Sequence, residues 1–175
     1  MLVLGAFVLG CDAPDPSPLV DVTGPLVVPD GWSASRLDHD PFVSHRPAAV
    51  TCPDAGWGVE GTSVEVSTGD CNYLSVEQPL LLDVPEGTRI VVNLWHQVLH
   101  AERPATGHAA LVVGDDLLWE REVAIPGPGA VHGDVVIAPR DLRASERVVF
   151  HLHNHGVNTW NLGDVFADGM EASQP

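Results

Sequence analysis

Residues 148 to 165 read VVFHLHNHGVNTWNLGDV, and this stretch decides the fold class. In its first half, three apolar residues alternate with Val149, His151 and His153. Because the side chains of a β-strand point alternately to opposite faces, this period of two predicts a strand with an apolar inner face and a histidine-bearing outer face. The Asn-His-Gly that follows predicts a turn into a second strand, which carries Trp160.

Similar short apolar runs, separated by turn residues such as Pro-Glu-Gly and Pro-Gly-Pro-Gly, fill the chain from Cys52 onward. No helical period of 3.6 residues persists in this part of the sequence. We therefore expect an all-β domain of two packed sheets, a β-sandwich of the jelly-roll kind. The predicted strands are residues 63–67, 72–76, 80–84, 89–98, 109–113, 117–125, 131–138, 147–154 and 159–166.

The sequence divides into four predicted segments. The first, MLVLGAFVLGC, is too short to span a bilayer and has the length of the apolar core of an export signal. A proline-rich tether follows and passes into irregular chain, where Trp32 and Phe42 are able to dock on the domain. The segments are residues 1–11 (signal), 12–50 (tether and irregular chain), 51–168 (β-sandwich) and 169–175 (tail).

Net charge limits the kinds of partner. The formal net charge is -16, and the eight basic residues are arginines scattered singly along the chain. A phosphate backbone needs a cluster of positive charge, so we expect no nucleic-acid partner. The net negative charge would also repel anionic lipid, so any membrane attachment must come from a covalent or hydrophobic anchor.

The small and aliphatic residues before Cys11 resemble the lipobox of bacterial lipoproteins. That resemblance implies that Cys11 is lipidated and becomes the mature N-terminus. It also implies that the protein lies in the cell envelope, outside the cytoplasm, anchored to a membrane by lipid. With Cys11 assigned to lipid, Cys52 and Cys71 form an even pair, which in an exported chain favours a disulfide over two separate buried thiols.

The domain also resembles the galactose-binding-like jelly rolls found in many carbohydrate-binding modules. The resemblance rests on GWGVEGTSVEVST at 56–68, LLLDVPEGTRIVVNLW at 80–95 and the final stretch quoted above. That family's last strand commonly ends in an aromatic, an aliphatic, an acidic pair and a valine. Trp160, Leu162, Asp164 and Val165 match this ending, whereas Gly163 stands where the first acidic residue is usual. The family implies a structural calcium ion near Asp164, and the glycine departs from that pattern.

Strand alternation also predicts a ligand site. In RIVVNLWHQ, residues 89–97, alternation sends His96 inward and leaves Asn93, Trp95 and Gln97 outward. If this strand shares a sheet with residues 147–154, these three side chains join His151 and His153 on one surface. A pyranose has an apolar face that stacks on an indole, and its hydroxyls need the donors and acceptors of amides and neutral imidazoles. We therefore expect a carbohydrate-binding surface, with no cofactor required.

The histidines support a second hypothesis, a zinc or copper site. Histidines two apart on a strand have Cα atoms about 6.6 Å apart, so the rings of His151 and His153 are able to converge on one ion. A third ligand would come from His96, with His100, His108 and His132 as alternatives. The asparagines near residue 158 also fit a purely structural role as loop caps.

Catalysis finds little support in the sequence. No nucleophile elbow, zinc-protease motif, phosphate-binding loop or dinucleotide fingerprint is present. We therefore predict a non-catalytic binding module. The remaining alternative is a structural envelope protein whose partner is another protein.

Overall fold

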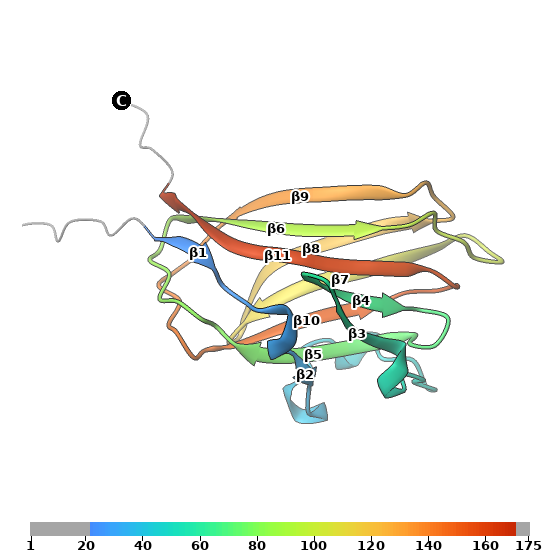
Figure 1. Cartoon of the computed structure of the whole chain (residues 1–175). Helices are drawn as coiled ribbons and strands as arrows, with labels where there is room; N and C mark the ends of the chain where they lie inside the picture. The colour runs from blue at the N-terminus through green and yellow to red at the C-terminus, as the bar shows by residue number, and fades with distance from the viewer. Residues whose placement is uncertain (1–21, 171–175) are drawn as a thin grey trace, which may run out of the picture.

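The computed structural model describes residues 22–170, which form two antiparallel β-sheets packed face to face (Figure 1). The predicted all-β sandwich is therefore confirmed. The first sheet, called sheet A, has the strand order β3-β4-β11-β6-β9, with β1 paired to β11, and sheet B has the order β2-β5-β10-β7-β8. The strands are β1 (Thr23–Pro25), β2 (Ser33–Ala34), β3 (Trp57–Glu60), β4 (Ser63–Ser67), β5 (Tyr73–Pro79), β6 (Thr88–His96), β7 (Ala105–Val113), β8 (Asp116–Ile125), β9 (Ala130–Ile137), β10 (Arg147–His153) and β11 (Thr159–Met170).

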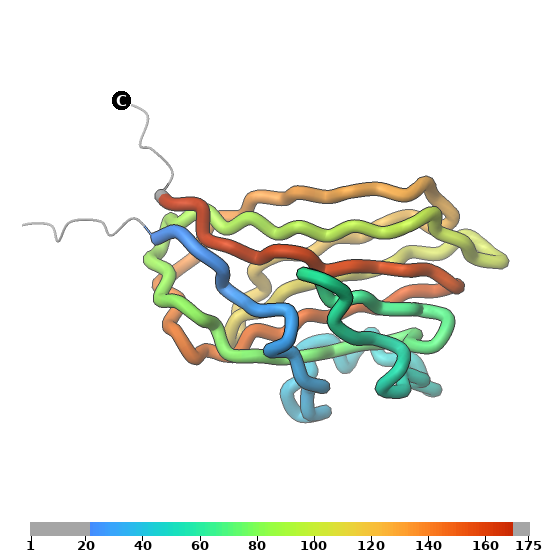
Figure 2. Tube along the Cα trace, in the orientation of Figure 1, coloured from blue at the N-terminus to red at the C-terminus, as the bar shows by residue number. Residues whose placement is uncertain are grey.

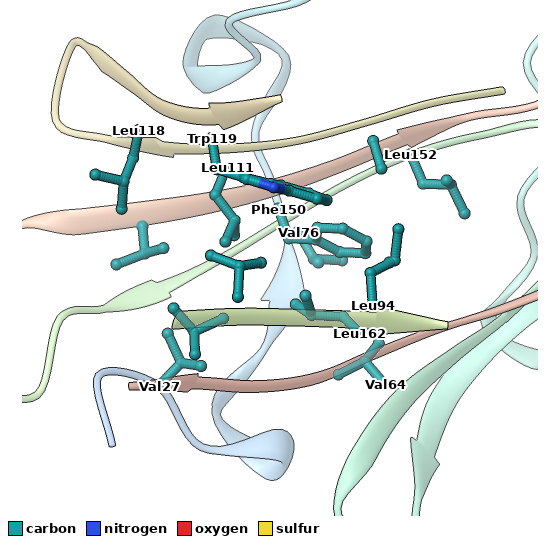
Figure 3. Packing of buried hydrophobic residues seen from close by; sticks show 14 of the residues in the cluster. Val27, Val64, Val76, Leu94, Leu111, Leu118, Trp119, Phe150, Leu152 and Leu162 are labelled. Carbon is teal, nitrogen blue, oxygen red and sulfur yellow. The ribbon is translucent and has the colours of Figure 1, made fainter. Parts of the chain in front are cut away.

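The apolar core fills the space between the two sheets. Phe150 and Leu152 of β10 face Leu94 of β6 and Leu162 of β11, and each of these side chains is at most 1% exposed (Figure 3). Burial of one such side chain stabilises the fold by about 1.5–3 kcal/mol. The apolar residues that alternate along residues 148–152 therefore face the core, as the sequence predicts.

Most predicted strands are confirmed with shifted ends, but two predictions need correction. Residues 80–84 form no strand: Leu80 exchanges backbone hydrogen bonds with residues 145 and 146, but the segment's one β-bridge is the isolated bridge between Val84 and Leu142. Pro85 follows directly and removes an amide donor, so a continuous ladder cannot form there. Strand β3 was not predicted, because Gly58 weakens its strand signal.

The sandwich begins well before residue 51, so the predicted domain boundary is wrong. Strand β1 pairs with β11, and β2 pairs with β5. Leu26 and Trp32 are buried in the core, the indole of Trp32 lying 6.3 Å from the ring of Phe150. Residues 22–50 therefore belong to the domain, and Figure 2 shows this segment running over its surface. Residues 12–21 of the predicted tether lie outside the described part of the chain.

The predicted disulfide between Cys52 and Cys71 is confirmed. It joins the irregular chain before β3 to the turn between β4 and β5. No helix within residues 22–170 combines the length and the apolar character needed to cross a bilayer.

Replacing both Cys52 and Cys71 with serine should lower the free energy of unfolding by about 3 kcal/mol, because the crosslink restricts the unfolded chain. Denaturant unfolding without reductant measures the change. Dithiothreitol should lower the stability of the wild type to that of the variant and leave the variant unchanged. Equal stabilities of the two proteins without reductant would contradict the expectation.

Candidate functional site

The five predicted ligand residues do not form one surface. That surface requires β6 and β10 to share a sheet, but β6 belongs to sheet A and β10 to sheet B. Asn93 and Trp95 therefore face outward from sheet A, whereas His151 and His153 face outward from sheet B on the opposite side of the sandwich. Gln97 is exposed just beyond the end of β6. Alternation was read correctly, but it carries no information on which strands pair.

The outer face of sheet A presents a row of side chains across adjacent strands. Trp95 of β6 lies opposite Asn161 of β11, Asn161 lies opposite Glu65 of β4, and Glu65 lies opposite Gly58 of β3. The inward neighbours of these residues lie in the core, so the row itself points away from the core. Adjacent strands are about 4.8 Å apart, so the Cα atoms of Trp95 and Glu65 are separated by about 10 Å along the row.

Gly163 explains how Trp95 is placed. A Cβ atom at Gly163 would come within 2.7 Å of Cζ3 of the Trp95 indole, so the ring lies directly over this glycine. Asn93 lies beside it, with its Oδ1 3.4 Å from the position of a Cβ atom on Gly133 of β9. The glycine that departs from the family's acidic pair is therefore the residue that makes room for the indole.

Glu60 and Glu65 form a carboxyl pair on the same face. The neighbouring Glu60 carboxylate, which accepts a hydrogen bond from the protonated form of Glu65, raises the pKa of Glu65 above its usual value, and burial adds to the effect. The pair borders a shallow hollow of about 320 Å³, which is also lined by Trp57, Gly58 and Ser67. Beside the pair, Ser63 Oγ donates a hydrogen bond to Asn161 Oδ1 at 3.3 Å. Sequence reasoning missed this pair, because Glu60 and Glu65 meet only through the β3–β4 hairpin.

The outer face of sheet B is covered by the chain around residues 37–46. Asp40 anchors this covering segment, because its carboxylate accepts hydrogen bonds from Tyr73 Oη at 2.7 Å and from Ser75 Oγ at 3.1 Å. Its Oδ1 also accepts from the backbone N–H of Phe42 at 3.0 Å. Phe42 stacks on His151 with ring centroids 4.5 Å apart. Docking of Phe42 on the domain, one of the possibilities that the sequence left open for this segment, is therefore realised, and the ring covers the histidine face.

His151 is fully buried although it lies on the outer face of its sheet. Burial, and then the neighbouring His108, lowers the pKa of His151 to about 3. The imidazole is therefore neutral at physiological pH. Its Nδ1 lies 3.1 Å from Ser75 Oγ. His153, two residues further on, is half-buried and packs against Tyr73 and His155.

The predicted metal set of His151, His153 and His96 is not brought together. His96 lies in sheet A, where its Nε2 is 3.2 Å from Nε2 of His132 and its ring packs on Trp160. Within residues 22–170, one group of three metal-ligating side chains has its ligand atoms close enough to share one ion, and its members are His45, His108 and His151.

The sequence-based predictions of metal ligands can be compared with this group of three histidines. His108 was an alternative ligand in the sequence reading, whereas His45 was missed, since it approaches sheet B only through the fold of the covering segment. Asp164 is exposed at the β11 bulge and belongs to no such group among the described residues, so calcium there stays a prediction.

Comparison with known proteins gives likenesses in structure only. No protein-family model matches the chain, and no curated protein matches its sequence significantly. A CBM4 structure is 12% identical, with a TM-score of 0.47, and the match covers 82% of this chain and 89% of that one. The K3 adhesin domain of Lys-gingipain from Porphyromonas gingivalis is 15% identical over 85% and 98%, with a TM-score of 0.48.

A third solved structure is TmCBM61 in complex with β-1,4-galactotriose, 14% identical over 69% of this chain and 79% of that one, with a TM-score of 0.36. The similar structures thus include carbohydrate-binding modules, the kind of jelly roll that the sequence resembles. At these identities and TM-scores they say nothing about which residues of this chain bind a ligand. The assignment of a site therefore rests on the geometry above.

Replacing Glu65 with glutamine should stabilise the protein at pH 7 by about 0.5 kcal/mol, because it removes repulsion between two neighbouring carboxylates. The raised pKa of Glu65 means that the folded pair is favoured at low pH, below its usual pKa of 4.5, and that this stability is lost as the pH rises through the raised value. The gain should therefore vanish at pH 4. Denaturant unfolding at both pH values measures it.

The matched control is Glu102→Gln. Glu102 is exposed on a loop, and its replacement by glutamine also removes one negative charge. This variant should show no comparable difference between pH 7 and pH 4. An equal gain in both variants would mean that net charge, and not the Glu60–Glu65 pair, is responsible.

Proposed function

We propose that the protein is a non-catalytic module that binds carbohydrate on the outer face of sheet A. The observation that carries the proposal is the position of Trp95, whose indole lies over Gly163 on the outward side of the sheet. A platform of this kind suits a sugar ring, because an indole offers a flat apolar face for the ring's C–H groups.

The polar groups around the indole supply what sugar hydroxyls require. Asn93 offers an amide beside the ring, and the row leads across Asn161 to the carboxyl group of Glu65. Amides both donate and accept, and the oxygens of a carboxylate accept. A ligand about 10 Å long could therefore stack at one end of the row and hydrogen-bond at the other.

The carboxyl pair argues against glycoside hydrolysis at this face. Retaining enzymes hold their two carboxyl groups about 5–5.5 Å apart, and inverting enzymes hold them about 6.5–9.5 Å apart. The carboxyl groups of Glu60 and Glu65 lie within hydrogen-bonding reach of each other, closer than either spacing. The pair is therefore suited to binding hydroxyls and not to acting as an acid and a base on opposite sides of a glycosidic bond.

Export and lipid anchoring complete the proposal. Cys11 lies outside the described residues, and its assignment rests on the lipobox resemblance. The disulfide supports an oxidising compartment outside the cytoplasm. We infer that a lipid on Cys11 holds the domain at a membrane of the cell envelope, with glycan as its ligand.

Trp95→Ala should weaken binding to polysaccharide roughly 30-fold, the loss expected for one central aromatic contact. Its melting temperature should stay close to that of the wild type, because the indole lies outside the core. Retention on immobilised cellulose, xylan, galactan and β-1,3-glucan identifies the ligand, and titration with the retained polysaccharide gives the Kd.

Two further variants sharpen this test. Gly163→Ala should also weaken binding, because the added methyl group would displace the indole. His153→Ala changes the opposite surface and should leave binding unchanged. The proposed site is wrong if no polysaccharide is retained, or if His153→Ala weakens binding more than Trp95→Ala.

Cys11→Ser should move the protein from the membrane fraction to the soluble fraction of a bacterial host, because the thiol that accepts the lipid is lost. Detergent-phase partition and mass spectrometry of the mature N-terminus measure the change. Ser17→Ala, a replacement in the adjoining predicted tether, should partition as the wild type does. A Cys11→Ser protein that stays in the detergent phase would rule out this anchor.

A further inference from the structure

Three histidines converge where the covering segment meets the outer face of sheet B. His151 comes from β10, His108 from the adjacent strand β7, and His45 from the 3₁₀ turn Val43–His45 of the covering segment. One ring nitrogen of each lies within 4.8 Å of the corresponding atoms of the other two. His108 and His151 are 7% and 0% exposed, whereas His45 is exposed at the rim of the cluster.

The second nitrogen of each buried ring is held by an acceptor. His108 Nε2 lies 2.7 Å from Glu120 Oε1, and a carboxylate only accepts, so this nitrogen carries the proton. Ser75 Oγ donates its proton to Asp40 Oδ1, so it accepts from Nδ1 of His151. Both rings are thereby fixed in one tautomer.

The fixed tautomers leave a lone pair on His108 Nδ1 and on His151 Nε2. Both atoms are buried and have no hydrogen-bond partner among the described residues. Leaving such a group without a partner destabilises the folded state, because the group has lost its hydrogen bonds to water. Two buried lone pairs in one cluster cannot hydrogen-bond to each other, because neither has a proton to donate. Both lone pairs are therefore available to a cation.

The arrangement has the features of a metal centre with its supporting partners. Metal-binding histidines typically donate their other N–H to a carboxylate or another oxygen, which orients the ring and raises its basicity. Glu120 does this for His108, and Ser75 with Asp40 does it for His151. Hydrogen bonds of this kind explain why these polar residues occupy the outer face of sheet B.

The spacing of the nitrogens suits an ion held by imidazole. Three nitrogens at about 2.0–2.1 Å from a tetrahedral ion are about 3.3 Å from one another. The present upper limit of 4.8 Å therefore needs to shorten by about 1.5 Å at most. His45 lies on an exposed turn and is the ligand most free to move inward. A set of three imidazoles without thiolate suits zinc or copper(II) better than calcium or magnesium.

We propose that His45, His108 and His151 bind one zinc or copper(II) ion, with Glu120, Ser75 and Asp40 as positioning residues. The ion joins the covering segment to two strands of sheet B and leaves a fourth position open toward solvent at His45. This site is independent of the proposed glycan face, which lies on the other sheet.

Metal binding should be measured on the full chain without a histidine tag, after treatment with a chelator. Titration calorimetry with zinc chloride and with copper sulfate should show one ion per chain, and magnesium chloride should show none. The melting temperature should rise with the free metal concentration, because only the folded state holds the three ligands together. Copper electron paramagnetic resonance should show hyperfine coupling to nitrogen.

Variants at the rim of the cluster test the assignment without disturbing the core. His45→Ala removes one ligand from an exposed turn and should weaken binding at least about 100-fold, and Glu120→Gln should weaken it about 10- to 100-fold. The matched control is His155→Ala, another exposed histidine, which should bind as the wild type does. Absence of stoichiometric zinc and copper binding would overturn the proposal, and so would binding that is lost in His155→Ala but kept in His45→Ala.

Discussion

The whole structure depends on the buried apolar contact between the inner faces of the two sheets. Phe150 and Leu152 from sheet B meet Leu94 and Leu162 from sheet A, with no polar side chain among them (Figure 3). Burial of these faces is the main stabilising force in a sandwich. Because each strand has only two faces, filling the inner one sends every second residue outward, so polar side chains collect on two surfaces that face in opposite directions.

These two surfaces have become chemically different. On sheet A, glycine at position 163 lets the Trp95 indole approach β11 closely, and the row beyond it ends at the carboxyl pair of Glu60 and Glu65. On sheet B, the covering segment anchored by Asp40 excludes solvent from His151 and keeps that imidazole neutral. An open platform suits an extended polar ligand, whereas a covered cluster of three imidazoles suits a small cation. One sandwich therefore supports two separate proposals.

Much of the fold follows from local patterns that the sequence displays directly. The alternation around His151 predicted correctly which residues point inward, and the cysteine pair predicted the disulfide. The covering segment could not be assigned, because its prolines and short apolar runs fit an extended tether equally well. Its docking depends on Asp40 meeting Tyr73 and Ser75, residues more than thirty positions away. His45 was missed for the same reason.

The sequence by itself determined the class of fold, the inward and outward faces of the strands and the crosslink, since these depend on side-chain period and on residues of one kind. Only the tertiary structure decided which outward faces coincide. It separated Trp95 from His151 and brought His45 to His108, because strand pairing joins segments distant along the chain. A period of two fixes the side of a sheet on which a residue lies, but the neighbours of a strand depend on the packing of the whole domain.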